Sequence, residues 1–203
     1  KDGLIIAGGD ITVNAVDDGI RGKDYLVIED GLINVTAGGD GLKSDEDEDA
    51  SMGYIAILAG TFSIDSGGDA IAAQNAVTIS SGEYKLNAGG GSTVMVGADA
   101  SAKGVKGLAS VSIDGGTFHI DTSDDAIHSN GSVTITGGSF EVSSGDDAVH
   151  ADQSLLINAG EINILASYEG LESTRITING GTIHLVSSDD GINGSDGSSS
   201  QGA

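Results

Sequence analysis

The chain has 203 residues, of which 34 are Gly and none is Cys, Pro or Trp, and its 31 Asp and Glu against 8 Lys and Arg give a formal net charge of −23. Nucleic acids and anionic lipids attract Lys- and Arg-rich surfaces, so this charge excludes a nucleic-acid partner and favours cations, above all divalent metal ions. Without Cys no disulfide stabilises the fold, and no apolar run is long enough to insert into a membrane.

A short acidic motif recurs along the chain: one or two acidic residues, then a small residue and an aliphatic one. It is complete at Asp17–Ile20, Asp124–Ile127, Asp146–Val149 and Asp189–Ile192, with weaker copies at 40–42, 69–71, 103–105 and 169–171. The steps from Lys103 to Asp125, Asp147 and Glu169 are each 22 residues, the length of one coil of a parallel β-helix. This regularity argues against the disorder that high charge and few aromatic residues otherwise indicate.

Each repeat contains three short strands in which apolar and polar residues alternate, as in a half-buried strand. The second strands place in one interior column Ile11, Ile33, Phe62, Tyr84, Phe118, Phe140, Ile162 and Ile183. The third strands place in another Ile20, Leu42, Ile71, Val105, Ile127, Val149, Leu171 and Ile192. Matching positions in every repeat predict one all-β domain over residues 1–203, a right-handed parallel β-helix (solenoid) of about eight coils with three short strands per coil.

Two insertions, at 45–53 and 87–101, interrupt the period, and we expect them to form loops. The first contains the acidic run Asp45 to Asp49, and the second is rich in Gly. One leaves a third strand and the other enters one, so both border the same face, which is where solenoids often bind ligands. Between them lies the coil of Ala70 to Ala73, whose small side chains leave room for a groove.

Stacked coils convert the acidic motif into a ladder of carboxylates about 4.8 Å apart. Ca²⁺ accepts six to eight oxygen ligands in irregular geometry, so neighbouring rungs can share an ion, whereas Mg²⁺ needs a compact octahedron. Zinc favours Cys and clustered His, which we do not expect here. The alternative is a solvated ladder without metal. The predicted calcium ligands are Asp18, Asp40, Asp125, Asp146, Asp147, Glu169, Asp189 and Asp190.

The rare basic residues gather beside this ladder. The side chains that follow the buried third-strand residue form an outward column of Arg21, Lys43, Ala72, Lys106, His128, His150, Glu172 and Asn193, and Lys103 stands within the acidic column itself. These bases either balance neighbouring carboxylates or, together with calcium, bind sugar carboxylates by charge-assisted hydrogen bonds.

Tyr25 and Tyr54 precede the first strands of adjacent coils and are expected to stack outside the core. They form either a small platform for pyranose rings or packing at the edge of the acidic insertion. The predicted carbohydrate-binding residues are Lys43, Lys103, Lys106, Ala72, Tyr25, Tyr54 and His128.

The segments Ser101–Lys106, Ser167–Glu172 and Ser188–Asn193 resemble the bacterial β-helix carbohydrate-binding domain family, whose founding members come from cellulolytic clostridia. This resemblance covers essentially the whole chain. It implies a secreted, polysaccharide-lyase-like β-helix that carries calcium and binds cellulose and acidic sugars.

The acidic turns also resemble those of calcium-dependent pectate lyases of the ninth polysaccharide-lyase family. That resemblance implies that Asp147 shares an ion with Glu169 and Glu172, and that Asp125 shares one with Asp146 and Asp147. The sequence departs from the pattern where Tyr168 replaces one acid and where His150 stands in place of another.

Two functions follow as expectations. The first is a secreted, non-catalytic, calcium-dependent module for plant cell-wall glycans such as polygalacturonate and cellulose. The second is a pectate lyase acting by β-elimination, with Lys43, Lys103 or Lys106 as the base. Neighbouring acids raise a lysine pKa, which weakens the enzyme hypothesis. An ice-binding or purely structural solenoid is the weakest alternative, because the outward first-strand column is irregular.

Overall fold

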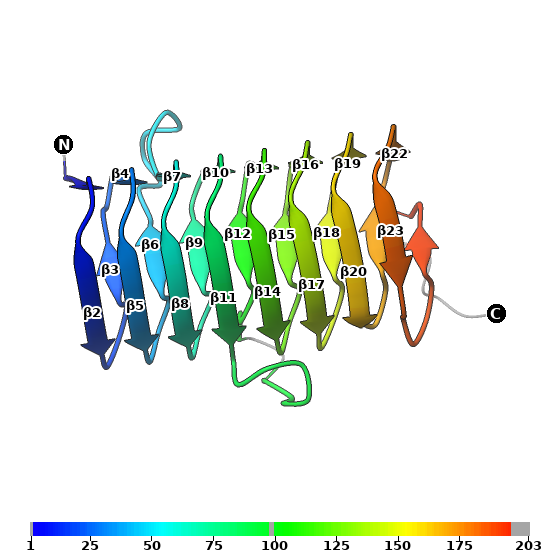
Figure 1. The fold of residues 1–203 in the computed structure, drawn as a ribbon, viewed down its shortest axis with the longest axis horizontal. Helices are drawn as coiled ribbons and strands as arrows, with labels where there is room; N and C mark the ends of the chain where they lie inside the picture. Colours follow the sequence, from blue (N-terminus) through cyan, green and yellow to red (C-terminus); the bar gives the residue numbers. More distant parts are fainter. Residues whose placement is uncertain (1, 98–99, 196–203) are drawn as a thin grey trace.

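The computed structural model describes residues 2–97 and 100–195, which form an elongated solenoid whose coils succeed one another along its long axis (Figure 1). The strands stack into three parallel sheets of eight strands each, and each coil gives one strand to each sheet. The predicted all-β parallel β-helix of eight coils, with three strands per coil, is therefore confirmed. No helix in the described part of the chain is long and apolar enough to cross a membrane.

The first strands of the coils form one sheet, in which apolar side chains alternate inward. Its members are β1 (Gly3–Ile6), β4 (Tyr25–Ile28), β7 (Tyr54–Ile57), β10 (Ala76–Ile79), β13 (Ser110–Ile113), β16 (Ser132–Ile135), β19 (Ser154–Ile157) and β22 (Ile176–Ile178).

The second strands form a sheet with longer members. They are β2 (Asp10–Ala15), β5 (Leu32–Ala37), β8 (Thr61–Ser66), β11 (Glu83–Ala88), β14 (Thr117–Thr122), β17 (Ser139–Ser144), β20 (Glu161–Ala166) and β23 (Thr182–Leu185).

The third strands are the shortest, and their sheet lies beside the acidic turns. They are β3 (Ile20–Arg21), β6 (Leu42–Ser44), β9 (Ile71–Ala73), β12 (Val105–Gly107), β15 (Ile127–Ser129), β18 (Val149–Ala151), β21 (Leu171–Ser173) and β24 (Ile192–Asn193).

The interior columns predicted from the sequence pack in register. Four rings of the second sheet form a continuous stack with centroid separations of 4.8, 4.5 and 4.6 Å, and they are Phe62, Tyr84, Phe118 and Phe140. The Tyr84 hydroxyl donates a hydrogen bond to the Ser81 carbonyl at 2.7 Å. Burial raises the pKa of Tyr84, so this phenol stays neutral in the core.

The small residue of the acidic motif is required by the close approach of adjacent coils. A Cβ on Gly41 would lie 2.4 Å from the Ile64 side chain and 2.6 Å from the Ala70 carbonyl oxygen. The same backbone position is filled by Ala70, Ala126 and Ala148 in other coils, all fully buried. There is therefore no room for a Cβ at Gly41, whereas in the other three coils a single methyl group fills the space between the turns.

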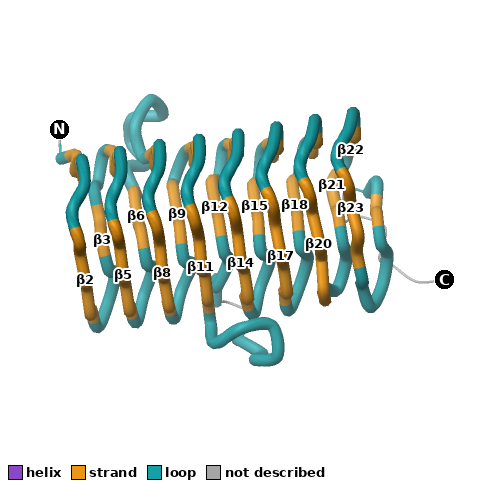
Figure 2. The backbone as a smooth tube through the Cα atoms, viewed as in Figure 1, coloured by secondary structure: helices purple, strands orange, loops and turns teal. Residues whose placement is uncertain are grey.

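Both insertions project from the body of the solenoid, at opposite edges of the third sheet (Figure 2). The first lies between β6 and β7 and matches the predicted 45–53. The second begins two residues later than predicted, because Asn87 and Ala88 complete β11 and pair with Asp121 and Thr122 of β14.

Candidate functional site

The acidic residues before the third strands form one ladder, and the backbone sets its spacing. The N–H of the small residue after each rung donates to the carbonyl of the rung in the next coil, as from Ala126 to Asp147 at 3.0 Å and from Ala148 to Glu169 at 3.0 Å. The rungs are Asp18, Asp40, Asp69, Lys103, Asp125, Asp147, Glu169 and Asp190. Side chains 21 to 34 residues apart in sequence are thereby held one above another.

One oxygen of a ladder aspartate accepts a hydrogen bond from the backbone of the next coil. Asp18 Oδ1 accepts from the Asp40 N–H at 3.0 Å, and Asp40 Oδ1 accepts from the Asp69 N–H at 2.9 Å. Asp125 Oδ1 similarly accepts from the Asp147 N–H at 3.0 Å. These bonds hold each carboxylate against the next turn and leave its Oδ2 for another partner.

The second oxygen meets a basic side chain, commonly the one three residues later. Lys43 Nζ lies 2.9 Å from Asp40 Oδ2 and 3.0 Å from Asp18 Oδ2, so it bridges two rungs. Burial alone would lower the Lys43 pKa, but hydrogen bonds to Asp40 and Asp18 outweigh it and raise this pKa. At the next coil, Lys106 Nζ lies 3.1 Å from Asp69 Oδ2. Local charge balance, one of the two interpretations of the basic column, therefore describes the contacts of Lys43 and Lys106.

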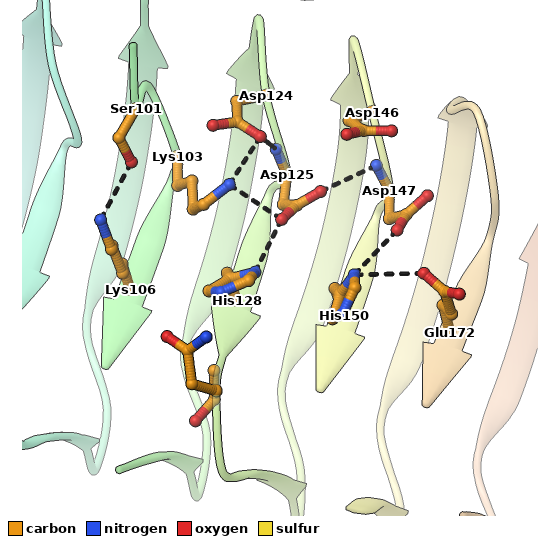
Figure 3. A network of polar contacts seen from close by, with 12 residues as sticks. Ser101, Lys103, Lys106, Asp124, Asp125, His128, Asp146, Asp147, His150 and Glu172 are labelled. Atoms are coloured by element: carbon orange, nitrogen blue, oxygen red, sulfur yellow. Dashed lines mark hydrogen bonds and ion pairs between the residues drawn. The ribbon is translucent and has the colours of Figure 1, made fainter. Parts of the chain in front are cut away.

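Lys103 occupies a rung position and takes the place of a carboxylate. Its Nζ lies 2.6 Å from Asp124 Oδ1 and 3.0 Å from Asp125 Oδ2, and its side chain is only 13% exposed (Figure 3). Asp125 also accepts from His128 Nδ1 at 2.7 Å. Burial alone would raise the Asp125 pKa, but His128 and Lys103 outweigh it and lower this pKa to about 2.

His150 contacts the rung Asp147 and two carboxylates outside the ladder, and it is the centre of a second cluster. Its Nδ1 lies 3.0 Å from Asp147 Oδ2 and 3.2 Å from Glu172 Oε2 (Figure 3). Its Nε2 lies 3.2 Å from Asp152 Oδ1. The hydrogen bond to Asp147 raises the His150 pKa to about 9. Burial, followed by the proximity of Asp147, raises the Glu172 pKa to about 7. The imidazole thus holds a proton between two carboxylates.

The pattern of bases breaks at Glu169. The residue three positions later is an acid, Glu172, and the equivalent residue of the following coil is Asn193, whose Nδ2 donates to Glu169 Oε1 at 3.1 Å. Within the described residues, Glu169 Oε2 is buried and has no hydrogen-bond partner. Burial raises the Glu169 pKa, and Glu172, Asp190 and Asp189 raise it further. In the part of the chain that the structure describes, no basic side chain forms an ion pair with Glu169.

Two large hollows adjoin this end of the ladder. The first, of about 470 Å³, is lined by Glu169 and its acidic neighbours Asp146, Glu172, Asp189 and Asp190. The second, of about 700 Å³, lies beneath the second insertion and contacts the loop side chains Val94, Met95 and Val96 together with Lys103, Asp124, Asp146 and Tyr168. Asp146 and Tyr168 line both hollows, so the two spaces are adjacent.

The groove predicted over Ala70 to Ala73 is also present, but it is smaller. A hollow of about 190 Å³ there is lined by Lys43, Ala72, Ala73 and Lys106, among others. Lys103 lines the larger hollow beneath the second insertion instead. The structure therefore brings Lys43, Lys106 and Ala72 together. Lys103 belongs to the same coil as Lys106, but its ammonium contacts Asp124 and Asp125 of the next coil, where His128 also lies.

Tyr25 and Tyr54 stack as expected, with ring centroids 5.7 Å apart and planes inclined by 16°. The Tyr25 ring also covers Gly3, where a side chain would lie 2.1 Å from Cζ. One face of Tyr25 therefore packs on the chain and the stacked faces pack on each other.

Sequence reasoning missed Asp124, His150 and Tyr168 as site residues, and one of its premises was wrong. Clustered His is present, because coil stacking brings the His128 and His150 ring centroids to 5.1 Å. Their separation of 22 residues, one full repeat, is the signal that would have revealed this pair. The spacing of three between Asp147 and His150 is a second signal.

A parallel β-helix with a backbone-aligned acidic ladder and adjoining hollows defines a ligand-binding solenoid. The chain matches the family described as carbohydrate-binding domain-containing protein over residues 1–148 and 146–191, and it belongs to that family. Searches of curated proteins and of solved structures each return no match. Family membership supports a carbohydrate as the binding partner and fits a non-enzymatic module.

The cluster around His150 predicts that the metal-free protein loses stability as pH rises from 5 to 9. Glu172 and His150 have folded-state pKa values of about 7 and 9, both above their ordinary values of 4.5 and 6.5. A raised pKa gives stability that is complete below the ordinary value and lost through the folded value. Because both side chains are partly exposed to solvent, we expect a loss of about 1 kcal/mol.

Urea unfolding with chelator at pH 5, 7 and 9 measures this loss. His150→Gln should flatten the pH profile, and His119→Gln, at an exposed position of β14, is the matched control. If the free energy of unfolding falls equally with pH in His150→Gln and in the unaltered protein, the assignment to His150 is wrong.

Proposed function

We propose that this protein is a calcium-dependent, non-catalytic module that binds cell-wall polysaccharide, with calcium held at the C-terminal end of the ladder. The observation that carries the proposal is Glu169 Oε2, a buried oxygen that lies among acidic side chains and has no hydrogen-bond partner in residues 2–97 and 100–195. Elsewhere Lys43, Lys103 or a His supplies the positive charge. At Glu169 the equivalent positions are Glu172 and Asn193, so the charge has to come from solution.

The donors fit calcium. Glu169, Asp189 and Asp190 offer only oxygen, and the hollow around them leaves space for water. Ca²⁺ accepts this mixture at 2.3–2.6 Å with variable geometry. The proposed ligand set is smaller than the one expected from the sequence. It leaves out Asp18, Asp40 and Asp125, because each of them contacts a lysine side chain of the protein itself. Sites with few fixed ligands bind calcium weakly and suit extracellular concentrations, which supports a secreted protein.

We place the glycan in the 700 Å³ hollow, next to this ion. Its volume is in the range of ligand sites, and it combines apolar loop side chains with a few polar groups. The half-exposed Tyr168 ring offers a surface on which a pyranose can stack, and it also borders the calcium hollow. Since Lys103 is paired with Asp124 and Asp125, an acidic sugar such as galacturonate would reach this surface through calcium rather than through lysine.

A binding role also agrees with the state of the lysines. β-Elimination needs a neutral base, but carboxylate contacts raise the pKa of Lys43 and of Lys103. We therefore expect no unsaturated product, detected by its ultraviolet absorbance, when polygalacturonate is incubated with protein and calcium. Sustained formation of unsaturated product would show that the protein is a lyase and would contradict the binding proposal.

Glu169→Gln tests the proposal directly. Removing one ligand charge is expected to weaken calcium binding, measured by calorimetry, and polygalacturonate binding at least about tenfold, which corresponds to about 1.4 kcal/mol. Chelation should do the same to the unaltered protein. Glu161→Gln on the exposed side of β20 is the control. If polygalacturonate binds equally with chelator, the calcium link is wrong, and if Tyr168→Ala leaves binding unchanged, the glycan lies elsewhere.

A further inference from the structure

Two of the four His residues stand in register on the outward side of the third sheet. His128 of β15 pairs with His150 of β18, and their rings are tilted by 42° at 5.1 Å. The other two, His119 and His184, lie on β14 and β23 of the second sheet. The third sheet therefore gathers imidazole nitrogen at the same place where the ladder gathers carboxylate oxygen.

Three donor atoms converge around His150. Its Nδ1 lies 3.0 Å from Asp147 Oδ2 and 3.2 Å from Glu172 Oε2, and one ligand atom from each residue lies within 4.8 Å of the others. Ligands bound to one ion at about 2.0–2.2 Å are separated by roughly 3–3.6 Å. The two measured separations fall in this interval, so small side-chain shifts would place an ion among the three atoms.

Two of these ligands are held in place, Asp147 by a backbone N–H and His150 by a neighbouring carboxylate. Asp147 Oδ1 accepts from the Glu169 N–H at 3.1 Å, which fixes the carboxylate and leaves Oδ2 toward His150. Asp152 Oδ1 lies 3.2 Å from His150 Nε2. A carboxylate on the far nitrogen orients a metal-binding imidazole and increases its basicity.

We propose that Asp147, His150 and Glu172 form a binding site for a borderline divalent transition metal ion, with Zn²⁺ as the best fit. The mixed nitrogen and oxygen donors select against calcium, which takes oxygen ligands, and favour ions that accept imidazole. Three protein ligands leave a fourth position, which opens into the 470 Å³ hollow and can hold water. The neighbouring His128 ring extends the donor set, since Asp125, His128 and His150 also form a compact group.

Charge balance alone does not require His here. Lys43 bridges the rungs Asp18 and Asp40 with an ammonium group, and Lys103 compensates Asp124 and Asp125 in the same way. An ammonium has no lone pair to offer a metal, whereas an imidazole gives one once its proton is displaced. The first half of the ladder is therefore balanced by lysine ammonium groups, which cannot bind a metal. At His150 it is balanced by an imidazolium, whose proton a metal ion can replace.

This site is separate from the calcium position proposed above, and the two can be tested apart. Calcium was assigned to Glu169, Asp189 and Asp190, whereas the new site depends on His150. Glu172 lines the hollow between them and is therefore left unaltered in the experiment.

Calorimetric titration of the chelator-treated full chain with ZnCl₂, and separately with CaCl₂, is the test. We expect one equivalent of zinc to bind, and His150→Gln to weaken it about 100-fold or more, because losing a ligand exceeds the 10- to 100-fold cost of losing a second-sphere partner. The calcium affinity of His150→Gln should stay within about threefold. Glu169→Gln should weaken calcium binding and leave the zinc affinity within about threefold. His119→Gln should change neither affinity.

Cobalt(II) gives a spectroscopic readout that is independent of stability. Bound in place of zinc, it should show visible absorption that changes in His128→Gln and is lost in His150→Gln, with circular dichroism confirming the fold of each variant. Zinc affinity unchanged in His150→Gln would overturn the proposal. So would failure of the unaltered protein to bind zinc, or loss of zinc only in Glu169→Gln.

Discussion

Lys103→Met is expected to lower the free energy of unfolding by about 3 kcal/mol. The Lys103 side chain is 13% exposed, and its ammonium is held between Asp124 and the nearly buried Asp125. Removing one partner of a buried ion pair leaves a carboxylate without a counter-charge, which costs more than the pair contributed. Chemical denaturation with chelator measures the change. Lys85→Met is the control, because Lys85 lies on the exposed side of β11.

The same substitution should also create dependence on calcium. Oxygens of Asp124, Asp125 and Asp146 lie within 4.8 Å of one another, and Lys103 compensates the first two. Without the ammonium, an ion can take its place and restore part of the lost stability by mass action. A loss below about 1 kcal/mol, or the same loss in Lys85→Met, would show that the ladder tolerates uncompensated charge.

Phe118→Ala is expected to destabilise the protein by about 3–5 kcal/mol. Phe118 is 1% exposed and stacks between Tyr84 and Phe140 at 4.5 and 4.6 Å. Truncation leaves a cavity in a column that neighbouring coils cannot close, because backbone hydrogen bonds fix their spacing. Thr117→Ala, at an exposed position of the same strand, should cost much less.

Denaturant titration of both variants gives the comparison, provided that the slope with denaturant is unchanged. Phe118→Leu should lose less than Phe118→Ala, since more volume is retained. Equal stabilities for Phe118→Ala and Thr117→Ala would mean that the aromatic stack contributes little.

The fold follows from the sequence because every coil of a solenoid has the same structural requirements. Each coil needs inward aliphatic residues, a glycine turn and a small residue after the acid, so a register such as Ile127 opposite Val149 follows from the period. The end of β11 was misplaced by two residues, since nothing local separates Asn87 and Ala88 from the inserted loop that follows.

The site was only partly predictable. Which residues form rungs is a matter of period, and that part followed from the sequence. Which carboxylate oxygen meets which base depends on rotamers and on the reach of side chains between coils. Lys43 contacts a rung of the preceding coil, whereas His150 contacts Glu172 of the following one, although both stand three residues after an Asp. The hollow beneath the second insertion depends on how that loop folds back, which has no periodic signal.

The in-register pairing of the coils has a genetic consequence. From Val105 to Leu171, aligned third-strand positions are separated by a constant 22 residues, and each coil contacts mainly its two neighbours. An in-frame tandem duplication of 22 codons in this stretch would add one coil, lengthen the rod by about 4.8 Å and keep every interior column aligned. If the duplicated unit contained His150, it would also add an imidazole to the ladder. Unequal recombination between repeats could therefore change the number of imidazoles in the ladder without disturbing the core.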